Sequence, residues 1–202
     1  MSIRRIAAIA TLLTLTACAA TPSASPTASA AEVANGPLEP GTYTASDFSP
    51  RIEVTVPERW ENFHTDPRFW DIVRVTDDGP IVLLVQQPTI VFGPPEGGSA
   101  TTPEEGMALL RQNSGLTVSE AEPIQIGGQD GLVVDIAATE EDTQVFAGER
   151  PLLGIGPTDS IRVALFAVDE GLLIIGFISP AGQMQAALNE LQPMVDSIRI
   201  GG

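Results

Sequence analysis

The sequence predicts an α+β domain in which a largely antiparallel β-sheet carries one main helix on each face. Alternating or continuously apolar segments, separated by turn residues, fill most of the chain after residue 38. Two stretches, 102–112 and 180–197, have helical signals instead, and each follows a run of predicted strands. An antiparallel sheet packed between two helices satisfies this order of elements.

The first predicted strands end at proline or at turn residues. Ile52–Val56 alternates aliphatic with polar residues and stops at Pro57. The next two strands, Phe69–Thr76 and Ile81–Gln86, flank the turn signal at 77–80, which predicts a hairpin. Residues 88–92 are expected to prolong it or to form a short edge strand, and the Gly- and Pro-rich stretch 93–98 is expected to be a loop.

The first helix has a complete N-terminal signal. Thr102 can cap it, Pro103 fits the first helical position, and Glu105 completes a capping box. Its apolar side is formed by Met107, Leu109 and Leu110. The sequence Asn113-Ser114-Gly115 is expected to end it.

Strands return in the second half. They are predicted at Leu116–Val118, Glu122–Ile126, Gly131–Ala138, Ile161–Val168 and Leu172–Ile178. Turns are expected at 127–130 and 169–171, and the glycine-rich stretch 148–156 is expected to be an irregular connection. The last two strands are almost continuously apolar, so both of their faces should be covered. The final helix should run from about Pro180 to Ser197, with a kink or restart at Pro193.

The composition is strongly acidic. The 202 residues have a formal net charge of −16, and all ten basic residues are arginine. Such a surface repels phosphate backbones and anionic lipid headgroups, which excludes nucleic acid as a partner and a basic patch as the membrane contact. The acids are scattered, which indicates a soluble surface more than a specific cationic partner.

The N-terminus predicts export. A short basic start is followed by an apolar run that is too short to span a bilayer. The ending Leu15-Thr16-Ala17-Cys18 resembles the lipobox of bacterial lipoproteins. The resemblance implies cleavage before Cys18 and attachment of acyl chains (diacylglyceryl, palmitate) to that residue. The alternative is an ordinary signal peptide with a stray cysteine, although Cys18 is the only cysteine in the chain.

Three regions follow from this interpretation. Residues 1–17 are a lipoprotein signal peptide, 18–38 are the lipidated cysteine and a flexible Ala/Ser/Thr/Pro tether, and 39–202 are a single α+β domain. Cleavage removes two arginines and no acid, which leaves a net charge of −18. The expected location is the outer face of the cytoplasmic membrane or another envelope membrane, with the membrane held through the lipid on Cys18.

Several motifs also resemble PsbP-like domains. They are the strand-Pro-x-x-Trp segment Ile52–Trp60, the capped helix at Thr102, the Gly-Gly-x-x-Gly hairpin at Gly127–Gly131 and the ending Met194–Arg199. The resemblance covers about residues 42–200 and implies an α/β/α sandwich. Some members of this family are photosynthetic accessory proteins and many others are bacterial lipoproteins. No catalytic residue carries over from it.

The sequence contains little that suggests catalysis. His64 is the only histidine, Cys18 is outside the domain, and there is no Gly-x-Ser-x-Gly motif. The acidic runs 77–78 and 140–142 lack the spacing of a calcium loop and are interpreted as solvated turns. Asp135 alternates with aliphatic residues and is expected to point outward. We therefore expect no catalytic site, no metal and no cofactor, and His64 paired with a carboxylate remains the only hydrolase hypothesis.

Aromatic residues cluster within the eleven residues 60–70. Trp60 is expected to cap the core, while Phe63, His64, Phe69 and Trp70 form a possible binding patch around a loop. The alternative is that these rings also pack in the core. At least one of Phe63, Phe69 and Trp70 should then be exposed.

These features lead to one main functional hypothesis and one alternative. The main hypothesis is a non-enzymatic binding or accessory module of the envelope, whose partner is an unknown envelope protein. The alternative is a carrier that holds a small apolar or lipid-like ligand in a cavity between sheet and helix.

Overall fold

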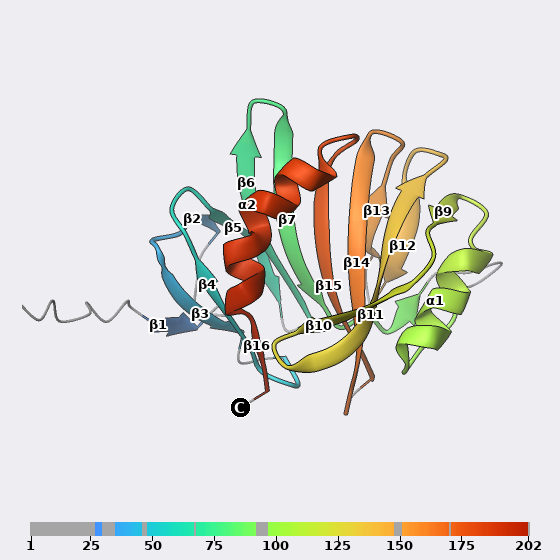
Figure 1. Cartoon of the computed structure of the whole chain (residues 1–202), viewed down its shortest axis with the longest axis horizontal. Helices are drawn as coiled ribbons and strands as arrows, with labels where there is room; N and C mark the ends of the chain where they lie inside the picture. The colour runs from blue at the N-terminus through green and yellow to red at the C-terminus, as the bar shows by residue number, and fades with distance from the viewer. Residues whose placement is uncertain are drawn as a thin grey trace, which may run out of the picture.

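A computed structural model describes residues 27–29, 35–45, 48–66, 68–91, 97–147, 151–169 and 171–201. Its central sheet has nine strands in the order β10-β11-β14-β15-β7-β6-β5-β2, with β9 also paired to β11 (Figure 1). These strands are β2 (Gly36–Pro37), β5 (Glu61–Asp66), β6 (Phe69–Thr76), β7 (Gly79–Gln86), β9 (Leu116–Val118), β10 (Glu122–Ile126), β11 (Gln129–Ala138), β14 (Asp159–Val168) and β15 (Gly171–Pro180). All the pairings within this sheet are antiparallel.

Two smaller sheets and two helices complete the described structure. One sheet contains β1 (Thr27–Ser29), β3 (Gly41–Ala45), β4 (Ile52–Val56) and β16 (Arg199–Ile200), and the other contains β13 (Pro151–Ile155), β12 (Thr143–Ala147) and β8 (Ile90–Val91). The helices are α1 (Pro103–Gln112) and α2 (Met184–Ser197). Neither described helix is long and apolar enough to cross a membrane.

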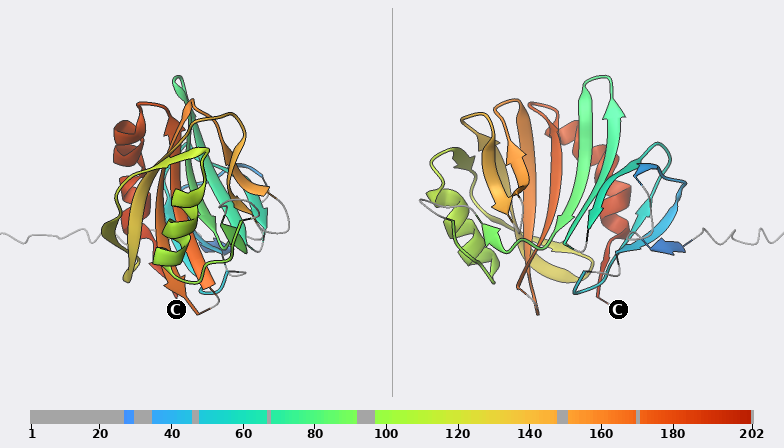
Figure 2. Two further views of the ribbon diagram at one scale, coloured as in Figure 1. Left: turned by 90° about the vertical axis from the view of Figure 1, so that its right-hand side faces the viewer. Right: turned by 180° about the vertical axis from the view of Figure 1, so that it is seen from behind.

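The central sheet separates two hydrophobic cores. On one face, alternate residues of β14 and β15 pack with α2 and with β3 and β4. On the other face, the intervening residues of the same strands pack with α1 and with β12 and β13. The buried residues of α2 belong to the first core and those of α1 to the second, and Figure 2 shows the two helices well apart from each other. The predicted fold class is therefore confirmed, and β14 and β15 are covered on both faces as their continuous hydrophobicity predicts.

The predicted hairpins are confirmed at their turns. Thr76 pairs with Gly79, Ile126 with Gln129 and Val168 with Gly171, so two residues form each turn. The capping box of α1 is also present. The amide of Glu105 donates to the hydroxyl of Thr102, and the Glu105 carboxylate accepts from the backbone amide of Thr102.

Three short strands of the N-terminal half have no signal in the sequence. Two of them, β1 and β2, lie within the segment 18–38 that is predicted to be a tether, and they pair with β3 and β5. Backbone pairing at a sheet edge requires no apolar side chains, and for that reason the composition gives no sign of these strands. The third is β5, formed by residues 61–66, which belong to the loop expected around the aromatic patch.

The second half also differs in two places. The stretch 148–156, expected to be irregular, contains β13, which pairs with β12. The final helix begins only at Met184 and continues through Pro193 to Ser197. The neighbours Leu191 and Met194 are fully buried on either side of Pro193, and this packing keeps the segment helical despite the lost amide donor.

Candidate binding groove

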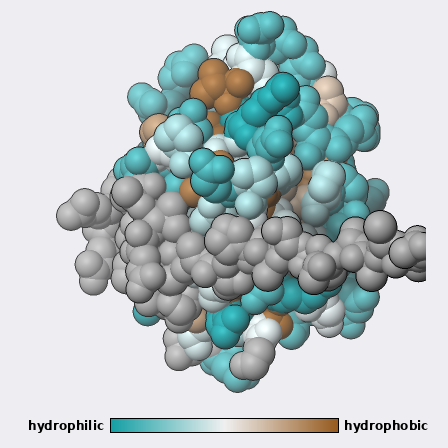
Figure 3. All heavy atoms as spheres, turned by 90° about the vertical axis from the view of Figure 1, so that its left-hand side faces the viewer, coloured by the Kyte–Doolittle hydropathy of each residue, from teal (hydrophilic) through white to brown (hydrophobic). Residues whose placement is uncertain are grey.

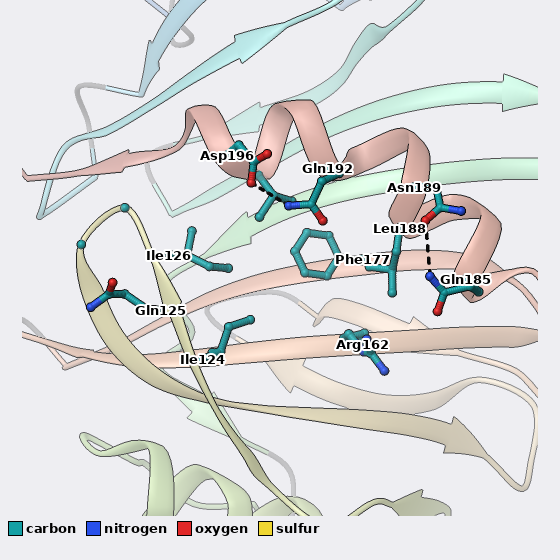
Figure 4. Close-up of a pocket in the computed structure, with 13 residues that line it drawn as sticks. Ile124, Gln125, Ile126, Arg162, Phe177, Gln185, Leu188, Asn189, Gln192 and Asp196 are labelled. Carbon is teal, nitrogen blue, oxygen red and sulfur yellow. Dashed lines mark hydrogen bonds between the residues drawn. The ribbon is translucent and has the colours of Figure 1, made fainter.

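A groove of about 550 Å³, open to solvent along one side, lies between α2 and the central sheet. One wall is α2, the floor is formed by β14 and β15, and the opposite wall is the hairpin of β10 and β11 (Figure 4). We call it the α2 groove. Its lining residues are Ile124, Gln125, Ile126, Gly127, Gly128, Arg162, Phe177, Gln185, Leu188, Asn189, Gln192, Val195 and Asp196.

The helical wall follows from the periodicity of α2. The groove residues of this helix recur at intervals of three or four positions, which places them on one side of the helix. The neighbouring side, with Ala187, Leu191 and Met194, is buried in the core. The helix is therefore fixed by its apolar side and presents an adjoining, mixed side to the groove.

Apolar side chains of the floor and of both walls form the inner part of the groove. Phe177 of β15 is 2% exposed and Ile126 of β10 is 4% exposed, and both belong to the core beneath α2. Leu188 and Val195 of α2 are half-buried against the same core. A ligand with an apolar body would remove the remaining exposed surface of these side chains from water.

Uncharged carboxamides line the rim. On α2, the Gln185 Nε2 group donates to Asn189 Oδ1 at 3.3 Å, and the Gln192 Nε2 group donates to Asp196 Oδ1 at 2.6 Å. Gln125, across the groove, donates through Nε2 to Asp130 Oδ1 at 2.8 Å. Because a carboxamide both donates and accepts hydrogen bonds, this rim can bind hydroxyl, amide or carbonyl groups of a ligand.

Arg162 supplies the positive charge of the groove. Its Nε and Nη2 groups donate to the two carboxylate oxygens of Asp135 at 2.7 and 2.8 Å. These hydrogen bonds raise the pKa of Arg162, while burial lowers it to a smaller extent. The guanidinium is therefore charged at any ordinary pH and largely neutralised by Asp135. Asp135 is exposed, in agreement with the prediction that it points outward.

The far wall depends on a glycine at the hairpin tip. Gly127 and Gly128 both have positive φ, of 60° and 83°, as the tight turn requires. A Cβ atom on Gly127 would lie 2.9 Å from Ile200 Cγ1 and 3.0 Å from the backbone nitrogen of Ile200. The tip thus lies directly against β16, and this contact positions the wall.

Two of the residues that line the α2 groove are ionisable. The ionisable side chains in its lining are Arg162 and Asp196, and both are hydrogen-bonded to neighbours. Within the described part of the chain, no group of three or more His, Cys, Asp or Glu residues is placed to hold a metal ion.

The structure separates the residues of the predicted aromatic patch. Phe63 is 65% exposed, but Phe69 and Trp70 are only 8% and 2% exposed. The Trp70 Nε1 group donates to Asn62 Oδ1 at 3.0 Å inside the core. The prediction that at least one of these three side chains is exposed is therefore met by Phe63, whereas Phe69 and Trp70 belong to the core and not to a binding patch, because the expected loop is largely the paired strands β5 and β6. Trp60 is in the core as expected, at 1% exposure.

The remaining predicted site residues give less information. His64 belongs to β5, where its backbone is opposite Asp71, but its side chain is not among those described. Leu15, Thr16, Ala17 and Cys18 lie outside the described residues. Of the predicted site residues whose side chains the structure describes, none lines the α2 groove.

Sequence reasoning missed this groove because its residues come from four separate elements between positions 124 and 196. Only two signals pointed to it. One is the Gly127-Gly128 turn, and the other is the row of carboxamides at helical spacing along α2.

No family model and no curated protein matches the chain. Among solved structures, it is similar to cyanobacterial PsbP from Synechocystis sp. PCC 6803, whose family the sequence motifs resemble, with 11% identity and a TM-score of 0.45 over 84% of this chain and 95% of that one. It is also similar to LpqN of Mycobacterium tuberculosis, described as involved in cell envelope biogenesis, with 10% identity and a TM-score of 0.41 over 84% and 91% of the two chains.

A Bacteroides thetaiotaomicron protein shares 13% identity and a TM-score of 0.41 over 75% of this chain. This chain spans 45% of the length of that protein. At such identities and TM-scores, the three similarities carry no argument about function.

Proposed function

We propose that this chain is an extracytoplasmic, non-enzymatic binding protein, anchored to a membrane of the cell envelope by lipid on Cys18. The N-terminal signal and the lipobox-like Leu15–Cys18 support the location. The α2 groove supports the binding role, and it is the observation on which the proposal depends. Its apolar floor, carboxamide rim and single arginine fit an elongated ligand with an apolar body and a few polar groups.

The groove also favours one form of the carrier hypothesis. It lies between sheet and helix, and its volume of about 550 Å³ is within the range of small-molecule sites. Because it is open along one side, a ligand would bind along the groove and would not be fully enclosed. An open site suits a protein that must take up and release its ligand, or present it to a partner.

A fluorescent probe tests the groove directly. The dye 1-anilinonaphthalene-8-sulfonate has an apolar ring system that can pack against the apolar side chains of the groove, such as Leu188 and Val195. We expect saturable binding to the folded protein, and Leu188→Gln should weaken it by roughly fivefold or more, since the α2 wall of the groove loses an apolar contact. Leu109→Gln, at a half-buried leucine of α1 on the other face, is the matched control.

Thermal unfolding of both variants must remain cooperative, because a partly unfolded protein binds this dye without a site. Equal loss of binding in both variants, or unchanged binding in Leu188→Gln, would argue against the α2 groove as the binding site.

A further inference from the structure

A second apolar surface lies on the opposite face of the sheet from the α2 groove. On β6 and β7, one set of alternate residues, including Trp70, Ile72, Leu83 and Val85, is buried beneath α2. The other set therefore points away from α2. Its members toward the hairpin tip are Val73, Val75, Pro80 and Val82, and we call them the outer β6–β7 face.

Val82 still packs against the core beneath α1, β12 and β13, and the part of this face nearer the hairpin tip extends beyond it. In register, Ile161 pairs with Ile178, Ile178 with Val82, and Val82 with Val73. The side chain of Ile161 is 1% exposed, whereas those of Ile178, Val82 and Val73 are half-buried. One pair further toward the tip, Val75 is 73% exposed opposite the exposed Pro80.

The figures agree with this arrangement. Seen from behind in Figure 2, β12 lies in front of one half of the sheet, whereas the tip of the β6–β7 hairpin extends beyond it. Figure 3 shows hydrophobic atoms just below the hydrophilic top of the molecule, where the β6–β7 hairpin ends. Val75 and Phe63 of the adjacent β5 are the large hydrophobic residues with high exposure in the described chain.

Acidic residues surround the outer β6–β7 face. Glu61 of β5 is opposite Val73, and Asp77 and Asp78 form the turn beyond Val75. All three are exposed. The one basic residue of β6 and β7, Arg74, alternates onto the α2 face, where it pairs with Glu190. The face is therefore an apolar strip with a negative rim.

We infer that the outer β6–β7 face docks a cationic, amphipathic segment of a partner protein, in which apolar side chains are flanked by Lys or Arg. The apolar strip would bury the partner's apolar side chains, and the acidic rim would pair with its charges. A second copy of this chain fits poorly, since each copy has a net charge of −16. An anionic lipid surface is repelled for the same reason.

The site is distinct from the proposed ligand groove, because the two lie on opposite faces of the central sheet. Either can therefore be disabled without the other. A variant that loses partner binding should still bind the dye used for the groove.

The test uses fluorescence anisotropy with a short labelled peptide that alternates valine with lysine, and a counterpart that alternates valine with glutamate. We expect the lysine peptide to bind the full chain and the glutamate peptide not to bind. Val75→Thr should weaken binding roughly fivefold, because it replaces an apolar contact by a hydroxyl at an exposed site that tolerates substitution. Asp77→Asn/Asp78→Asn should weaken it comparably and reduce its dependence on salt.

The matched controls are on other parts of the surface. Val118→Thr changes a half-buried valine of β9, and Glu140→Gln/Glu141→Gln removes two exposed acids. Both should leave the Kd within about twofold. Equal binding by the parent and Val75→Thr, or equal loss in the controls, would overturn the inference.

Two other results would also overturn it. One is sedimentation in which the parent chain forms a dimer that Val75→Thr disrupts, because a second copy would then be the occupant. The other is binding to phosphatidylglycerol vesicles that depends on Val75, because a lipid surface would then be the occupant.

Discussion

Asn62 and Trp70 form a hydrogen bond within the core, at 1% and 2% exposure. The indole N–H of Trp70 can be buried at this position only because the Asn62 amide oxygen accepts from it. This one contact explains why a tryptophan in a polar stretch of sequence belongs to the core and not to a surface patch.

Asn62→Ala should therefore destabilise the fold. The substitution leaves the Trp70 N–H without the Asn62 acceptor, which costs about 1–3 kcal/mol of unfolding free energy. Chemical denaturation measures this cost. Asn189→Ala, at an exposed asparagine of α2, should change stability by less than about 0.5 kcal/mol. Similar values for the two variants would mean that the Asn62–Trp70 hydrogen bond contributes little.

At the scale of single elements, the N-terminus of α1 has the contacts that its sequence predicts. Thr102→Ala removes the side-chain acceptor for the Glu105 amide, and should cost about 1 kcal/mol of unfolding free energy. Ligand binding at the α2 groove should be unchanged, because α1 covers the other face. Gln112→Ala, at an exposed position near the other end of α1, is the control. A cost below about 0.3 kcal/mol would show that the cap does not stabilise the helix.

The same cap makes α1 sensitive to acid. Hydrogen bonds from the backbone and hydroxyl of Thr101, and from the backbone of Thr102, lower the pKa of Glu105 below its ordinary 4.5. Since the folded pKa is below the unfolded one, the stabilisation is complete at neutral pH. It is lost as the pH falls through the folded value. Glu105→Gln should flatten the acid limb of a stability–pH curve more than the neighbouring Glu104→Gln does, and identical acid limbs would contradict this.

Local sequence signals predicted where single elements lie more completely than they predicted which elements pack together. The strand Ile52–Val56 and the α1 cap could be read from adjacent residues, because alternation and capping are local properties. The strands β1, β2 and β5 could not, since edge pairing depends on which backbone lies alongside. The α2 groove was missed for a related reason, because only the packing of α2 against β10, β14 and β15 brings its residues together.

At the scale of the whole molecule, the proposal joins a membrane anchor to a domain with two distinct surfaces. Cys18→Ser should release the protein from the membrane fraction into the soluble extracytoplasmic fraction, since two or three acyl chains are needed for stable anchoring. Cell fractionation with immunodetection measures this. Ser23→Ala, five residues along the segment, is the control. Membrane-bound mature protein without acyl chains on residue 18 would contradict the anchor.

Native mass spectrometry of the protein purified from its own membranes tests the central claim most directly, namely that the α2 groove holds a ligand. The parent and Leu188→Gln should be transferred to the gas phase under mild conditions and compared for non-covalent adducts. Leu109→Gln is the control. The account predicts an adduct on the parent and on Leu109→Gln that is strongly reduced on Leu188→Gln. Identical spectra for the three proteins, whether all carry an adduct or none does, would contradict it.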